Sequence, residues 1–152
     1  MKDMFSYQDL LGYQQTAFIN LILQIAILAM LAAAVWFKSK GIFRKHGTLM
    51  TAAVILNLVS FITVMGPSFA GSVSSNFATQ PPYSYPVTLV HVVFGSISLV
   101  SSICLVGAWH LQSSTEGCVR RKQIMRITIT LWTVALLLGI TLYIILYPNM
   151  LP

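Results

Sequence analysis

Charged residues are scarce in this chain of 152 residues, at 8% of the total, where a soluble domain carries about a quarter. Only three acids occur, Asp3, Asp9 and Glu116, and all of them fall outside the long hydrophobic stretches. The scarcity excludes a surface that water solvates on all sides. The missing carboxylates exclude a paired-acid active site and a relay of acids through a membrane.

Cysteines and catalytic motifs are equally sparse. Cys104 lies within a hydrophobic stretch and Cys118 in a predicted loop, so no structural disulfide is expected. The chain has no Cys-x-x-Cys pair, no glycine-rich phosphate loop and no set of Ser, His and Asp suited to nucleophilic catalysis. These absences favour a protein that is not itself an enzyme.

Hydrophobic residues make up 57% of the chain and gather in four stretches, near residues 17–37, 48–69, 87–111 and 127–147. Each stretch is close to the ~20 residues that cross a bilayer as a helix, and strands would leave open sheet edges in lipid. The second stretch is expected to end at Gly66 and Pro67. The sequence therefore predicts one membrane domain, residues 1–152, folded as an all-α up-and-down bundle of four transmembrane helices. Residues 1–16 are expected to form a short amphipathic segment at the membrane interface.

Eight of the nine basic residues fall in two clusters between hydrophobic stretches. They are Lys38, Lys40, Arg44 and Lys45, then Arg120, Arg121, Lys122 and Arg126. The positive-inside rule places both clusters in the cytoplasm, so both termini are expected on the non-cytoplasmic side of the cell membrane. Neither cluster forms a stripe interleaved with exposed aromatic residues, and no nucleic-acid partner is predicted.

Small and polar residues recur at helical spacing and predict the faces that pack together. In a membrane such residues mark helix contacts, because lipid tails solvate large apolar side chains equally well. Asn57, in the middle of its helix, is expected to find an interhelical hydrogen-bond partner. The predicted inward stripes are His46, Met50, Ala53, Asn57 and Ser60; His91, Gly95, Ser98 and Ser102; and Arg126, Thr130 and Thr133, with Ala135 and Gly139 beside them.

His46 opens the second helix and His110 closes the third, so the topology puts both near the same end of the bundle. Two imidazoles facing each other across a bundle can hold haem iron axially, and the pair is a candidate site for haem b. In the alternative interpretation, both are interfacial residues close to anionic lipid headgroups.

His91, His46 and Met50 are candidate metal ligands. His91 lies about a turn inside the third helix, where an ionisable residue either bonds within the bundle or serves a metal, haem or proton-transfer function. His46 and Met50 stand four residues apart on one helical face. Imidazole with thioether suits copper or haem, although methionine is also common in apolar helices.

Several short motifs resemble those of the YozB-like family of small four-helix membrane proteins, which is domain of unknown function 420. They are the run Arg-Lys-His-Gly-Thr-Leu-Met at 44–50, His91, Met125, Trp132 and the run Gly-Ile-Thr-Leu-Tyr at 139–143. The likeness covers about residues 40–147. In that family the fourth helix opens with His-x-x-x-Met, as the second helix does, but here Arg121 stands four residues before Met125. The similar openings of the second and fourth helices in that family imply that the bundle consists of two repeated helix pairs.

Genes of that family lie near those for respiratory oxidases and their copper-delivery and haem-insertion factors, so the resemblance implies a respiratory membrane. Our leading hypothesis is a non-catalytic accessory subunit or assembly factor of a larger membrane redox or metalloenzyme complex. The alternative is a small haem- or copper-binding membrane redox protein that uses His46, His110 or His91. No acidic residue or interrupted helix in mid-membrane favours a transporter.

Overall fold

The computed structural model describes residues 2–74, 84–111 and 122–146, with side chains at 15–71, 84–110 and 122–146. The described elements are all helical: α1 (Lys2–Ser39), α2 (Phe43–Ser60), the π-helical turn η1 (Phe61–Met65), α3 (Gly66–Ser74), α4 (Ser84–Leu111) and α6 (Lys122–Leu146). Four stretches are long and apolar enough to cross a membrane: Gln15–Ser39, Phe43–Gly71, Ser84–His110 and Lys122–Leu146. The prediction of an all-α multi-pass membrane protein is confirmed.

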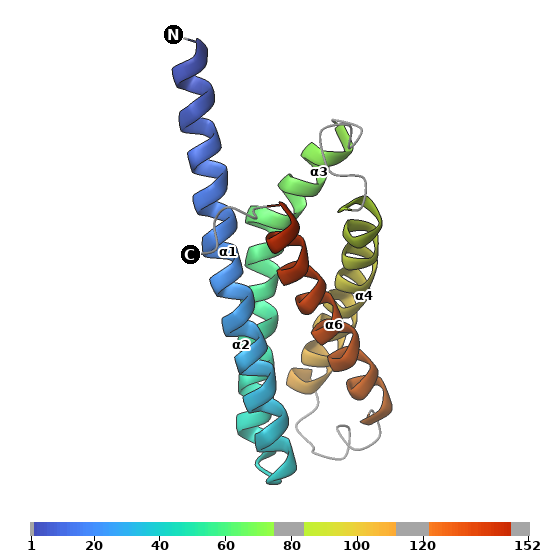
Figure 1. The fold of residues 1–152 in the computed structure, drawn as a ribbon. Coiled ribbons are helices and arrows are strands. Elements are labelled where there is room, and N and C mark those ends of the chain that lie inside the picture. The colour runs from blue at the N-terminus through green and yellow to red at the C-terminus, as the bar shows by residue number, and fades with distance from the viewer. Residues whose placement is uncertain (1, 75–83, 112–121, 147–152) are drawn as a thin grey trace.

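The four long helices form two antiparallel hairpins that pack together (Figure 1). α1 packs on α2 and α4 on α6, while contacts of α1 with α6 and of α2 with α4 close the bundle. The α1–α2 turn with its flanking residues and the first two turns of α6 carry all but one of the basic residues that the structure describes. We call the end of the bundle where they lie the basic end. It is at the bottom of Figure 1.

The turn between α1 and α2 is set by Gly41, which has a φ of 74°. This left-handed conformation favours glycine because a side chain would crowd the backbone. Two backbone bonds close the end of α1: Ile42 N–H donates to the Phe37 carbonyl at 3.0 Å, and Gly41 N–H donates to the Lys38 carbonyl at 3.1 Å. The pattern is that of a Schellman cap, and it lets α2 start two residues later. His46 consequently lies beside the last turns of α1.

Two helix boundaries differ from the sequence prediction. α1 is one continuous helix of 38 residues, about 57 Å at 1.5 Å per residue, so the expected interfacial segment continues the first membrane span. The second helix does not end at Gly66 and Pro67, but continues through η1 into α3. Pro67 follows the π-helical turn directly, and such a turn is a local rearrangement that interrupts the regular hydrogen-bond pattern inside a helix.

The core confirms the predicted inward faces of α2 and α4, and on α6 it confirms Ala135 but corrects Arg126 and Thr130, which are exposed. On α2 the residues His46, Ala53 and Ser60 are buried, and on α4 so are Ser98 and Ser102. On α6 the buried residues are Thr128, Trp132, Ala135, Leu136 and Tyr143. Thr130 is exposed and donates to the carbonyl of Arg126 in its own helix, so it needs no partner in another helix.

A polar cluster joins α1 to α2 in the half of the bundle away from the basic end. The Gln24 amide donates to the Ser60 hydroxyl at 3.1 Å, and that hydroxyl donates to the Asn20 side-chain oxygen. Asn57 was expected to supply such a bond. It is buried, yet its side chain has no hydrogen bond to the described residues, and Ser60 takes this role one turn later.

Candidate functional site

His46 is held in one orientation by a carbonyl of the neighbouring helix. Its side chain is 4% exposed, and its Nδ1 lies 2.8 Å from the carbonyl oxygen of Ala34. A carbonyl can only accept, so Nδ1 carries the proton and donates. In the neutral ring Nε2 then keeps its lone pair, which is the arrangement that orients metal-binding histidines.

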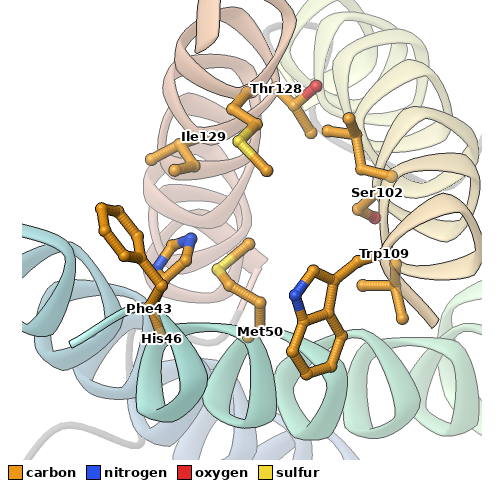
Figure 2. Close-up of a pocket in the computed structure, with 11 residues that line it drawn as sticks. Phe43, His46, Met50, Ser102, Trp109, Thr128 and Ile129 are labelled. Atoms are coloured by element: carbon orange, nitrogen blue, oxygen red, sulfur yellow. The ribbon is translucent and has the colours of Figure 1, made fainter. Parts of the chain in front are cut away.

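The imidazole of His46 and the thioether of Met50 both point into a cavity near the basic end (Figure 2). The cavity lies between α2, α4 and α6. A second thioether, that of Met125, also lines it. The full lining consists of Phe43, His46, Gly47, Met50, Ser102, Leu105, Val106, Trp109, Met125, Thr128 and Ile129. We call this cavity the His–Met pocket.

The size of the His–Met pocket limits what it can hold. Its volume is about 40 Å³, whereas a single water needs roughly 10–15 Å³ by the same kind of measure. An ion with one or two waters fits this space. A porphyrin would require the helices to separate.

Trp109 forms one wall of the pocket, and its indole ring packs against the backbone of α2 at Gly47. A Cβ atom placed on Gly47 would lie 2.5, 2.7 and 2.8 Å from three carbons of the indole ring. Real Cβ atoms do not approach other atoms so closely, so the Trp109 ring occupies the space that any side chain at Gly47 would need. Gly47 therefore permits the wall to close, and Figure 2 shows the indole beside Met50.

His110 lies outside the His–Met pocket. Its side chain is exposed, its Nε2 is 3.4 Å from the Thr51 hydroxyl, and its ring is T-shaped to that of Trp109, with ring centroids 4.8 Å apart. The structure thus places His46 and His110 at the same end, as predicted, but only His46 lines the pocket. Haem ligation by this pair stays a prediction.

His91 belongs to a different part of the bundle. Its Nδ1 donates to the carbonyl oxygen of Ala135 on α6 at 2.8 Å. The nearest pocket residue on α4, Ser102, follows it by 11 positions, or about 16 Å of helix. Of the three predicted metal ligands, the structure brings together His46 and Met50 and leaves His91 apart.

Apart from His46 and Met50, none of the lining residues was predicted as a site residue from the sequence, and two of them shape the site: Met125 as a second sulfur donor and Trp109 as a wall. A signal for Met125 was available. α2 and α6 both start at the basic end, and Met50 and Met125 both lie in their first two turns. In an up-and-down bundle such helices lie diagonally across the core, so core-facing residues near their starts can line the same cavity. Trp109 carried no comparable signal, because a tryptophan at a membrane interface is common.

The described residues hold no group of three or more His, Cys, Asp and Glu side chains that could bind a metal ion. A site of the zinc type is therefore not found in this part of the chain. The potential metal ligands in the His–Met pocket are softer than those of a zinc site, because they comprise one imidazole and two thioethers. No known protein family, curated protein or solved structure matches this chain. The resemblance to the YozB-like family stays a prediction.

Proposed function

We propose that the protein is a non-catalytic accessory subunit or assembly factor of a larger membrane metalloenzyme, and that its His–Met pocket holds a soft metal ion, Cu(I), for that complex. The observation that carries the proposal is the convergence of His46, Met50 and Met125 on one small cavity. Thioether ligands select Cu(I), and imidazole suits copper as well. The Ala34 carbonyl supports the choice, because it fixes the imidazole with Nε2 available.

The surroundings of the pocket favour holding an ion over transforming a substrate. Pockets for organic substrates have volumes of roughly 300–1,000 Å³, well above the size of this cavity. One of its two hydroxyl groups is also engaged within its own helix, because Ser102 donates to the carbonyl of Leu99. No acid lies in the described membrane spans to serve as a general base.

The lateral surface of the bundle suits attachment to other membrane subunits. Large apolar side chains are exposed along every span, among them Ile62, Val100, Ile127 and Ile19. Lipid covers such faces by default, and other transmembrane helices can replace lipid through close packing. The resemblance to the YozB-like family implies respiratory oxidases as the class of partner. We propose a respiratory membrane complex on that basis.

Metal binding is tested on the purified protein in mild detergent, by titrating Cu(I) against a chromogenic Cu(I) chelator. We expect one Cu(I) per chain, with affinity lowered at least tenfold in His46→Ala and in Met50→Leu. Met65→Leu is the matched control, because Met65 lies in η1 and does not line the pocket. Equal affinity in all four proteins contradicts a site in this pocket. A Soret band that disappears in His110→Ala would favour the haem alternative.

The accessory role is tested separately, by crosslinking in the native membrane and by deleting the gene. We expect the protein to co-purify with a copper-dependent membrane enzyme whose activity falls on deletion and recovers with the wild-type protein. Recovery that is equally complete with His46→Ala argues against a role for the pocket. An isolated monomer with unchanged respiration argues against the accessory role itself.

A further inference from the structure

The α1–α2 turn concentrates positive charge that the described residues leave unbalanced. Lys38, Lys40, Arg44 and Lys45 fall within eight positions. The acids among the described residues are Asp3 and Asp9, at the other end of α1. Because that end is more than 40 Å away at 1.5 Å per residue, these carboxylates cannot pair with the cluster. A counter-charge must come from outside this part of the chain.

Two of the cations are held against aromatic rings. The rings of Trp36 and Phe37 meet edge to face, with centroids 5.0 Å apart. The Lys40 Nζ lies 6.0 Å from the centroid of Trp36, and the Lys45 Nζ lies 5.5 Å from the centroid of Phe37. Cation–π contacts of this kind restrict where an ammonium group can move. The two lysines on either side of Gly41 are therefore each held beside one ring of the same aromatic pair.

The same turn carries an exposed apolar surface. Trp36 is 56% exposed, Ile42 40% and Phe43 39%. Such residues next to cations fit a molecule that combines an anionic group with hydrocarbon chains. At the end of a membrane span this is the position of the lipid headgroup and the first methylenes of its acyl chains.

We propose that the α1–α2 turn is a binding site for one anionic phospholipid. Its phosphate is bound by Lys40 and Lys45, and its acyl chains lie along Trp36 and Ile42. The attraction of a basic segment to anionic lipids is general. The aromatic pair and the left-handed Gly41 turn make this site distinct from the basic residues at the start of α6. The proposal does not depend on metal binding, since neither lysine lines the His–Met pocket.

The test is native mass spectrometry of the protein released from vesicles of phosphatidylcholine that contain a minor fraction of phosphatidylglycerol. We expect one phosphatidylglycerol to stay bound to the wild type, in excess over phosphatidylcholine. The double variant Lys40→Gln/Lys45→Gln should lower that occupancy at least fivefold. The control Lys122→Gln/Arg126→Gln removes the same charge from α6, where both residues are exposed, and should keep the lipid.

Three results overturn the proposal. If both double variants lose bound phosphatidylglycerol equally, the lipid is attracted by the overall positive charge and not by a specific site. Equal retention of the two lipids shows that the headgroup charge is not recognised. Displacement of the lipid by millimolar inorganic phosphate shows an anion site without a lipid component. Circular dichroism checks that the variants keep the helical content of the wild type, as expected for changes at exposed side chains.

Discussion

Replacing Gly47 with alanine tests the wall of the His–Met pocket directly. The added methyl group would meet three carbons of the Trp109 ring at 2.5–2.8 Å, so the indole must move or the helices must separate. Forcing an extra carbon into a packed interior costs about 1–3 kcal/mol. Alanine in place of glycine favours the helix by about 1 kcal/mol, which offsets part of this cost.

Gly107→Ala provides the reference that separates these two terms. Gly107 lies in α4, two residues before Trp109, and a Cβ atom there would meet no atom within 4 Å. It should therefore gain the helix preference without the clash. We expect Gly47→Ala to be less stable than Gly107→Ala by about 1–3 kcal/mol, the overpacking term alone.

The assay is reversible unfolding in mixed micelles with increasing sodium dodecyl sulfate, followed by circular dichroism. Trp109→Leu should remove the obstacle, so that Gly47→Ala in that background costs no more than Gly107→Ala does in the wild type. A non-zero coupling between positions 47 and 109 is the signature of their contact. Coincident curves for Gly47→Ala and Gly107→Ala in the wild-type background would refute the packing of Trp109 on α2.

Three further predictions concern other parts of the bundle. Ser60→Ala removes the link between Gln24 and Asn20 and should destabilise the protein by about 0.5–2 kcal/mol in the same unfolding assay, whereas a neutral result would show that water replaces the hydroxyl. Gly139→Ala places a methyl group 3.0 Å from the His91 ring and should shift the ring resonances in NMR spectra, which unchanged resonances would contradict. A cysteine at Ser75 should react with an impermeant thiol reagent from outside intact cells and Cys118 only after permeabilisation, and the reverse pattern would invert the predicted topology.

The fold could be predicted from the sequence because membrane-spanning helices have a strong signal in their hydrophobicity. Hydrophobic stretches of the right length identify the four spans, and small or polar residues at helical spacing identify the inward faces of α2 and α4. Boundaries were harder to predict. Pro67 suggested an end to the second helix, yet the helical segment continues past it, with a π-helical turn directly before the proline.

The candidate site was predicted only in part, because a helical pattern gives the face of a residue but not its distance from another helix. His46 and Met50 share a face on one helix, so their proximity follows from spacing alone. Gly95 was expected at a close helix contact, but a Cβ atom there would meet nothing within 4 Å. The close approaches occur instead at Gly47, against Trp109 of the other hairpin, and at Gly139, against His91 within the α4–α6 hairpin, and helical spacing alone gives neither distance.

The most direct test of the proposed function is X-ray absorption spectroscopy of the protein loaded with one equivalent of Cu(I). If the ion sits in the His–Met pocket, its first coordination shell contains both sulfur from Met50 and Met125 and nitrogen from His46. Met125→Leu should then lower the sulfur contribution and leave the nitrogen in place. A shell of nitrogen and oxygen alone, unchanged in Met50→Leu and Met125→Leu, would contradict the proposed site.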